Sequence, residues 1–264
     1  MTGVSLVLDG KVALISGGSR GIGAETVRLF TQAGARVAFG YEKAWERAEA
    51  LAAECGGRER CVAIKQNLST PEDGRALVRA AVHAFGRLDA LVANHGIWEA
   101  ADAPIAAMKE TQWRRTLGVN LDSVFGLVQA AVGQMEAQAR LDSCDTAGHI
   151  VLISSTAGQR GEAYHADYAV TKGALISLTK SLSSELAAKG IRVNCVAPGW
   201  VDTEMSAGTL EDRARGSRIL EGIPVGRPAS AREIAGPVLF LCTPLAGFIS
   251  GEVLNVNGGA VLVG

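Results

Sequence analysis

The stretch KVALISGGSRGIG, residues 11–23, decides the fold of this chain. Its first half, KVALIS, is a short run of β-branched and apolar residues that predicts a buried strand. A glycine-rich turn follows, and Gly17, Gly21 and Gly23 lead into the helical pattern of ETVRLFTQAG. Glycines at such places permit a tight turn and let backbone N–H groups approach a pyrophosphate at the positive end of a helix. The stretch therefore predicts the first strand, turn and helix of a dinucleotide-binding unit.

A glycine-rich turn alone is weak evidence, but the alternation of strand and helix continues along the chain. Near-continuous apolar strands between Ala-rich helical segments predict a parallel sheet covered on both faces, an α/β Rossmann-like doubly wound fold of about seven strands. No Pro- or Ser-rich linker and no internal repeat interrupts this pattern, so we expect residues 1–264 to form a single domain. The predicted strands are residues 11–16, 35–40, 61–66, 88–94, 149–155, 191–197 and 252–257.

Two segments break the alternation. QARLDSCDTAG, residues 138–148, has the composition of a surface loop. Residues 203–224 are long, charged and punctuated by glycine, as a lid over a substrate site would be. A solvated helix is the alternative for the second segment.

Bulk composition excludes several classes of protein. The net charge is −1 with no basic run, which argues against a nucleic-acid partner. No apolar run approaches the roughly 20 residues of a membrane span, and no basic segment leads into an apolar one at the N-terminus, so we expect a cytoplasmic protein with no membrane partner. The five cysteines are scattered and form no CxxC, which indicates reduced thiols. The four histidines lack ligand spacing, so we predict no metal site.

The run YAVTK places a phenol, Tyr168, and an ammonium, Lys172, on what would be one face of a helix. A free phenol has a pKa near 10, and lowering it to about 7 needs roughly 4 kcal/mol. A cation at about 4 Å, with an effective dielectric constant near 20, supplies about that much. The pair is thus suited to proton transfer. Because such pairs also share a helix face by accident, the other motifs must decide.

Together these motifs resemble the short-chain dehydrogenase/reductase family, in its common cytoplasmic type, over almost the whole chain. The spacing of Gly17, Gly21 and Gly23 differs from that usual in the extended sugar-nucleotide epimerases, and the spacing of Tyr168 and Lys172 is shorter than in the related enoyl reductases. The resemblance implies an NAD(P)-dependent oxidoreductase domain that reduces a ketone to a secondary alcohol, reversibly. Within the family, ketoreductases of the 3-oxoacyl-ACP reductase type are nearest by motif, including IPVGRPASAREIA.

By position, the resemblance implies catalytic roles for four residues. Tyr168 is the expected general acid, and Lys172 is expected to lower the pKa of the phenol and to hold the nicotinamide ribose. Ser155, in ISSTAG, matches the serine that hydrogen-bonds the substrate carbonyl, with Ser154 as its competitor. Asn120, in GVNLDSVF, matches the asparagine that holds a water in the proton relay. Ser155 could also merely end a strand and Asn120 cap a helix, but four matching spacings favour catalysis.

The resemblance also implies the cofactor contacts. Pro198 and Gly199 match the turn beneath the nicotinamide, while Val201 and Thr203 match contacts to its carboxamide. The expected cofactor-binding residues are Gly17, Ser19, Arg20, Gly21, Ile22, Gly23, Tyr41, Asn67, Leu68, Asn94, Gly96, Tyr168, Lys172, Pro198, Gly199, Val201 and Thr203.

The expected cofactor is NADP(H), with NAD(H) as the alternative. NAD enzymes usually place a carboxylate at the end of the second strand, where this chain has Tyr41. Arg20 with Ser19 is placed to grip a 2′-phosphate, although Arg20 could instead be a solvated loop residue. Glu42 opposes this preference and Lys43 offsets it.

Three positions depart from the family pattern. In ANHG, Asn94 and Gly96 match, but His95 replaces a small residue; it either tunes the pocket or fills a gap, and filling is favoured. Asn67 stands where an aspartate usually accepts from the adenine amine, and its amide oxygen can still accept. Asn257 likewise replaces a common aspartate.

The sequence selects no single substrate beyond a small-molecule ketone or alcohol. A 3-oxoacyl-ACP substrate is disfavoured because Arg140 and Lys189 are the only plausible basic docking residues near the site mouth. A dinucleotide-sensing protein without catalysis is the alternative from another class, but such a protein would be free to lose the tyrosine or the lysine. The residues expected near the substrate are Ser155, Gln159, Arg160, Glu162, Tyr164, Tyr168, Trp200 and residues 203–224.

Self-association is expected from two segments that are apolar or small nearly all round, residues 123–135 and 169–182. The terminal run GGAVLVG would otherwise expose apolar surface. The family packs such helices across a dimer axis, so we predict a homotetramer.

Overall fold

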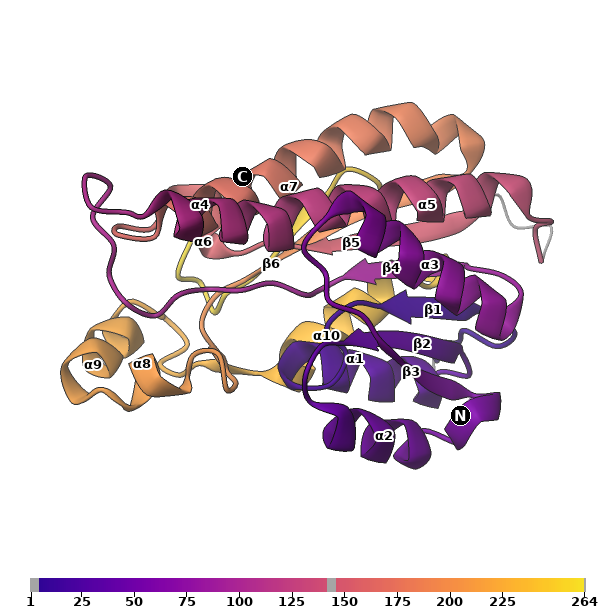
Figure 1. The fold of residues 1–264 in the computed structure, drawn as a ribbon, viewed down its shortest axis with the longest axis horizontal. Helices are drawn as coiled ribbons and strands as arrows, with labels where there is room; N and C mark the ends of the chain where they lie inside the picture. Colours follow the sequence, from indigo (N-terminus) through magenta and orange to yellow (C-terminus); the bar gives the residue numbers. More distant parts are fainter. Residues whose placement is uncertain (1–4, 142–145, 264) are drawn as a thin grey trace.

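The computed structural model describes residues 5–141 and 146–263. Its main sheet has seven parallel strands in the order β3-β2-β1-β4-β5-β6-β9, with helices on both faces (Figure 1). Each of the seven predicted strands is present, and the predicted Rossmann-like doubly wound α/β fold is confirmed. The strands are β1 (Val12–Ile15), β2 (Arg36–Tyr41), β3 (Cys61–Lys65), β4 (Ala90–Ala93), β5 (Gly148–Ile153), β6 (Ile191–Pro198) and β9 (Val253–Val256).

Two apolar layers form because side chains alternate between the faces of each strand. In β1, Ala13 and Ile15 pack toward α1 and α10, whereas Val12 and Leu14 pack toward α3, α5 and α7. The first layer contains α1 (Gly21–Gln32), α2 (Trp45–Glu54) and α10 (Ala231–Leu241), and the second contains α3 (Pro71–Phe85), α5 (Ser123–Ala137) and α7 (Ala166–Leu186). Helix α4 (Glu110–Leu117) runs into α5 through the π turn η2 (Gly118–Asp122). The short turns η1 (Gly57–Glu59), η3 (Ala187–Lys189) and η4 (Pro244–Ala246) complete the connections.

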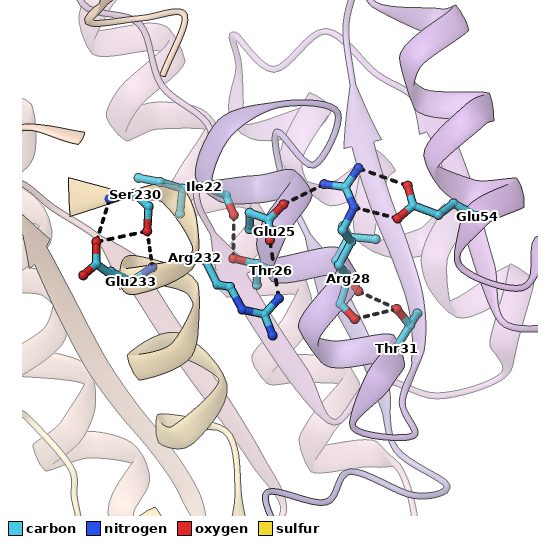
Figure 2. Close-up of polar contacts among 10 residues, drawn as sticks. Ile22, Glu25, Thr26, Arg28, Thr31, Glu54, Ser230, Arg232 and Glu233 are labelled. Carbon is cyan, nitrogen blue, oxygen red and sulfur yellow. Dashed lines mark hydrogen bonds and ion pairs between the residues drawn. The ribbon is translucent and has the colours of Figure 1, made fainter. Parts of the chain in front are cut away.

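Helix α1, which carries the end of the glycine-rich stretch, is joined to both its neighbours (Figure 2). Arg28 donates two hydrogen bonds to Glu54 at the end of α2, at 2.8 and 3.0 Å. Arg232 of α10 lies 3.8 Å from Glu25. Ion pairs this exposed contribute only about 0–1 kcal/mol each, so most of the stabilisation comes from buried apolar groups such as Phe30.

The carboxyl ends of the parallel strands meet at one edge of the sheet, where ligands bind in folds of this kind. Beyond this edge lie α6 (Thr156–Arg160), the small sheet of β7 (Val201–Asp202) and β8 (Ala229–Ser230), and helices α8 (Ala207–Glu211) and α9 (Arg213–Glu221). In Figure 1 α8 and α9 stand apart from the main sheet. They occupy the predicted lid, and Arg215 of α9 donates to Asp102 of the loop after β4 at 3.1 Å. Closure of the segment over a substrate stays a prediction.

In the described part of the chain, no helix is long and apolar enough to cross a membrane. Four cysteines are free and buried: Cys55, Cys61, Cys195 and Cys242. Cys144 and the middle of the predicted surface loop, residues 142–145, lie outside the described residues.

Candidate active site

In the turn after β1, the glycine positions leave no room for larger side chains. Gly17 and Gly21 have φ of 66° and 52°, in the left-handed region that favours glycine. A Cβ on Gly23 would lie 2.1 Å from the Gly17 carbonyl oxygen. The turn ends at Arg20, whose side chain makes no capping hydrogen bond to α1. The first N–H groups of α1 therefore have no side-chain cap, and the turn fits the pyrophosphate of a dinucleotide.

A cavity of about 720 Å³ opens at the carboxyl edge of the sheet, beside this turn. It is lined by every predicted cofactor-binding residue except Gly23, which packs behind the turn. The expected residues that line it are Gly17, Ser19, Arg20, Gly21, Ile22, Tyr41, Asn67, Leu68, Asn94, Gly96, Tyr168, Lys172, Pro198, Gly199, Val201 and Thr203.

Tyr168 and Lys172 extend from α7 to the wall of this cavity. Burial raises the pKa of Tyr168 to about 12, a hydrogen bond with Ser155 lowers it, and the charge of Glu162 raises it. The Lys172 ammonium lies 5.6 Å from the centroid of the phenol ring. Burial is the largest cause of this shift, and the charge of Lys172, which was expected to lower the phenol pKa, is not among its causes.

Lys172 is itself buried, with 4% of its surface exposed. Its Nζ donates to the Ile153 carbonyl at 2.8 Å. Burial lowers the pKa of Lys172 to about 8, while Cys195 raises it. The side chain is therefore still mostly cationic at neutral pH.

The two candidate serines have different partners. Ser154 is buried, and its hydroxyl donates to the Lys172 carbonyl at 2.7 Å. Ser155 begins α6, accepts from the Ala157 N–H at 3.1 Å, and lines the cavity beside Tyr168. The geometry favours Ser155 as the serine that meets a substrate.

Asn120 does not line the cavity but lies fully buried behind it, in η2. Its Oδ1 accepts from the Ile97 N–H at 2.8 Å, and its Nδ2 donates to the Ile97 carbonyl at 2.9 Å. A Cβ on Gly96 would meet Asn120 Oδ1 at 3.3 Å and Lys172 Nζ at 3.4 Å. Asn120 Oδ1 and Lys172 Nζ therefore both lie close to Gly96, and their shared part in a proton relay stays a prediction.

Aromatic and charged side chains also line the cavity. Trp98 and Trp200 meet edge to face at 5.9 Å. Glu162 and Arg160 line the same wall; burial raises the pKa of Glu162, and the charges of neighbouring His165 and Arg160 lower it. This mixture suits a substrate that carries polar groups beside an apolar portion.

Two residues that were expected near the substrate do not line the cavity, and other lining residues were not expected. Gln159 does not line the cavity and donates to Asn255 of β9 at 2.6 Å, while Tyr164 is exposed with φ of 67°. Trp98 and Arg115 line the cavity without having been predicted. Of the two, only Trp98 has a signal in the sequence, because it closely follows a strand whose carboxyl end lies at the site.

The expectation that Arg140 and Lys189 flank the site mouth is wrong. Arg140 donates to the Lys189 carbonyl at 3.1 Å, and Lys189 lies two residues before the start of β6. Both residues therefore lie at the amino ends of the strands, on the opposite edge from the cavity. Basic residues that do line the cavity include Arg20, Lys43, Arg115 and Arg160.

Asparagine stands at two positions where the family usually has aspartate. Asn67 lines the cavity, where its amide can still accept a hydrogen bond. Asn257 is buried, donates to the Val261 carbonyl at 2.9 Å and accepts from the Gly259 N–H at 3.0 Å. Asn257 thus closes the turn after β9.

Comparison with known proteins finds relatives that match almost the whole chain. A family model described as enoyl-(acyl carrier protein) reductase matches residues 17–261. The 3-oxoacyl-[acyl-carrier-protein] reductase FabG of Vibrio cholerae is 37% identical over 256 residues, which cover 97% of this chain and 99% of that protein.

Solved structures agree with this result. A short-chain dehydrogenase/reductase, glucose/ribitol dehydrogenase, from Brucella melitensis has a TM-score of 0.87 and 34% identity, and the match covers 98% of this chain and 100% of the other. A blue fluorescent protein from a metagenomic library, in complex with NADPH, has a TM-score of 0.85 and 34% identity, with 97% and 99% of the two chains covered.

Proposed function

Because this chain belongs to the short-chain dehydrogenase/reductase family, we propose that it reduces a ketone to a secondary alcohol with NAD(P)H, reversibly. The observation that carries the proposal is that Tyr168, Ser155 and Lys172 share one cavity with a glycine turn shaped for a dinucleotide. A protein that only senses the dinucleotide has no need of a buried phenol and ammonium beside its binding site.

The nicotinamide supplies the hydride when it is bound. The residues of the chain then have to bind the carbonyl oxygen and give it a proton. The Tyr168 hydroxyl is the donor, and its raised pKa keeps the proton on the phenol at neutral pH until transfer. Ser155 donates a second hydrogen bond to the same oxygen. Lys172 holds the cofactor ribose and, with Asn120 behind it, returns a proton to the phenol.

Two variants test these roles. Tyr168→Phe removes only the proton donor, so turnover should be lost while the dissociation constant for the cofactor stays near the wild-type value. Lys172→Met should lose both turnover and cofactor affinity, since one ammonium serves both. Substantial residual turnover by Tyr168→Phe would overturn the assignment, and normal cofactor affinity in Lys172→Met would overturn the dual role.

NADPH is the proposed preferred cofactor. Arg20 and Ser19 line the cavity beside Tyr41, where an NAD enzyme would carry a carboxylate. Glu42, the acidic residue that opposes the preference, lies 3.4 Å from Lys43, which offsets its charge. The ratio of kcat/KM for NADPH and NADH on one ketone decides the preference, and Arg20→Ala should lower it. Higher efficiency with NADH would overturn the proposal.

The substrate class is proposed at the level of a ketone with polar substituents, from the aromatic and charged lining of the cavity. A 3-oxoacyl thioester is the second candidate, because the Vibrio cholerae relative is named a 3-oxoacyl-[acyl-carrier-protein] reductase. Loss of NADPH absorbance with a hydroxylated ketone, acetoacetyl-CoA and a simple alkyl ketone separates these classes.

A homotetramer is the proposed assembly. The two segments from which self-association was expected contain Phe125 on α5 and Val170 on α7, which are 48% and 49% exposed. Phe248 and Leu262, near the C-terminus, are exposed as well. Burying such apolar groups against another copy removes them from water. A monomer in light scattering at micromolar concentration would refute this.

A further inference from the structure

His95 lies two residues after the end of β4, and both its ring nitrogens make hydrogen bonds. Nδ1 lies 2.7 Å from Ser16 Oγ. Nε2 lies 2.9 Å from the Val119 carbonyl oxygen and 2.7 Å from Ser123 Oγ. Ser16 precedes the glycine turn, and Val119 and Ser123 flank Asn120. The imidazole therefore joins the end of β1, the end of β4 and the π turn.

These partners fix the tautomer of the ring. A carbonyl oxygen can only accept, so Nε2 must carry the hydrogen that faces Val119. Nδ1 is then the acceptor and takes the hydroxyl hydrogen of Ser16. The Ser16 oxygen in turn accepts from the backbone N–H groups of Asn94 and His95, at 3.0 and 3.2 Å. Burial lowers the pKa of His95 to about 3, and the charge of Lys172 lowers it too, so the ring is neutral and is not itself a proton carrier at neutral pH.

Nε2 contacts the Val119 carbonyl, which the π turn leaves without its usual helical N–H donor. The Ser123 N–H bonds to the Gly118 carbonyl, five residues back, rather than to that of Val119, four residues back. A helix carbonyl that loses its usual donor needs another partner when it is buried. Val119 obtains two, from His95 Nε2 and from the Ser123 hydroxyl at 2.8 Å. His95 thus compensates for the hydrogen bond that the π turn removes.

The π turn determines the direction of Asn120. In a helix each residue is rotated by about 100° from the previous one, so loss of the extra residue in the turn would swing Asn120 away from its present direction. In that direction Asn120 bonds Ile97, and its Oδ1 lies close to Gly96, as does Lys172 Nζ. The arrangement of the proton relay therefore depends on the turn.

We propose that His95 is a positioning residue whose imidazole holds the π turn in place and so orients Asn120 toward Lys172. This inference rests on the proposed function, since it assigns His95 to the support of the same proton relay. His95 then does more than fill a gap left by a small residue.

Two substitutions at His95 test the inference, with His149→Gln as the matched control. His95→Ala removes the Nε2–H donor, and His95→Gln keeps an N–H donor of similar reach. His149 is also a buried histidine, but it lies near the start of β5, on the far edge of the sheet. The measurements are kcat and KM for the ketone, the pH profile of kcat, NADPH affinity by fluorescence, and the unfolding temperature.

We expect His95→Ala to lower kcat about 10- to 100-fold, as small misplacements of catalytic groups do, with KM within about three-fold of wild type and a displaced pH profile. His95→Gln should recover kcat to within about five-fold of wild type. His149→Gln should lose stability and keep the wild-type kcat and pH profile. A wild-type kcat and profile in His95→Ala would overturn the inference, as would a His95→Gln no better than His95→Ala.

A measurement without turnover keeps the test independent of the proposed function. The ¹⁵N shifts of the His95 ring should show a neutral Nε2–H tautomer between pH 6 and 8, and an Nδ1–H or a doubly protonated ring would overturn the inference. Should His95→Ala fail to fold, His95→Gln and the tautomer decide alone. A wild-type protein inactive on every ketone would defeat the proposed function, while the ring tautomer would still test the hydrogen bond to Val119.

Discussion

Gly23→Ala is expected to abolish tight NADPH binding, because the added methyl group has no room. Its Cβ would lie 2.1 Å from the Gly17 carbonyl oxygen and 2.7 Å from Asn94 Nδ2, whereas real Cβ contacts stay above 3.0 Å. The Gly17 carbonyl would have to move by about 1 Å, and a displacement of that size in an active site lowers the rate of the reaction about 100-fold. We therefore expect the dissociation constant for NADPH to rise at least about 100-fold, or about 3 kcal/mol.

Fluorescence titration with NADPH and thermal unfolding measure both consequences. Overpacking typically costs about 1–3 kcal/mol of stability. In a chain of this size that lowers the unfolding temperature by about 2–4 °C for each kcal/mol. Gly133→Ala is the matched control, since Gly133 lies in α5 with nothing within 4 Å of its added Cβ. That variant should keep wild-type NADPH affinity and gain up to about 1 kcal/mol. Wild-type affinity in Gly23→Ala would refute the reasoning.

Three further perturbations give separate readouts. Burial lowers the pKa of His149 to about 4. Below about pH 6.5 the unfolded chain therefore binds a proton at this residue that the folded chain does not bind, and the free energy of unfolding should fall by about 2 kcal/mol between pH 7 and 5. In urea unfolding, His149→Gln should remove that loss. Ser154→Ala deletes the hydrogen bond to the Lys172 carbonyl and should cost about 1–3 kcal/mol of stability. It should nevertheless keep far more turnover than Ser155→Ala, and equal kcat values would contradict the choice of serine. Since burial raises the pKa of Tyr168 to about 12, the rate of alcohol oxidation should increase with pH from 7 to 10, and a rate independent of pH over that range would contradict a phenolate base.

The strands were predictable because their signal is local. Each is a short run of β-branched and apolar residues. Because both faces of a parallel sheet are buried, these runs lack the alternation of apolar and polar residues that marks a half-exposed strand. The glycine turn was predictable for the same reason, as its requirement for small residues is written into consecutive positions. The arrangement of residues on the cavity wall followed from the strand order, since all carboxyl ends meet at one edge.

Contacts between segments that lie far apart in the chain could not be predicted from the sequence. Trp98 comes from a loop without periodicity, and only the fold brings it within 5.9 Å of Trp200. Arg140 was misplaced because its distance along the chain from the site is short, whereas α5 runs antiparallel to the strands and carries it to the opposite edge of the sheet. The role of His95 needed the π turn, and a single inserted residue in a helix leaves no pattern of its own in the sequence.

Burial explains why the pKa of Tyr168 differs from the sequence-based expectation, whereas Lys172 stays mostly cationic at neutral pH as expected. Attraction between the two groups is opposed by the cost of removing each of them from water. In the structure that cost raises the pKa of the phenol to about 12 and lowers the pKa of the ammonium to about 8. Both shifts are compatible with reduction at neutral pH, because a proton donor must hold its proton until the carbonyl oxygen takes it. For the reverse reaction the phenol has to lose that proton first, so the same burial makes alcohol oxidation the direction that depends on alkaline pH.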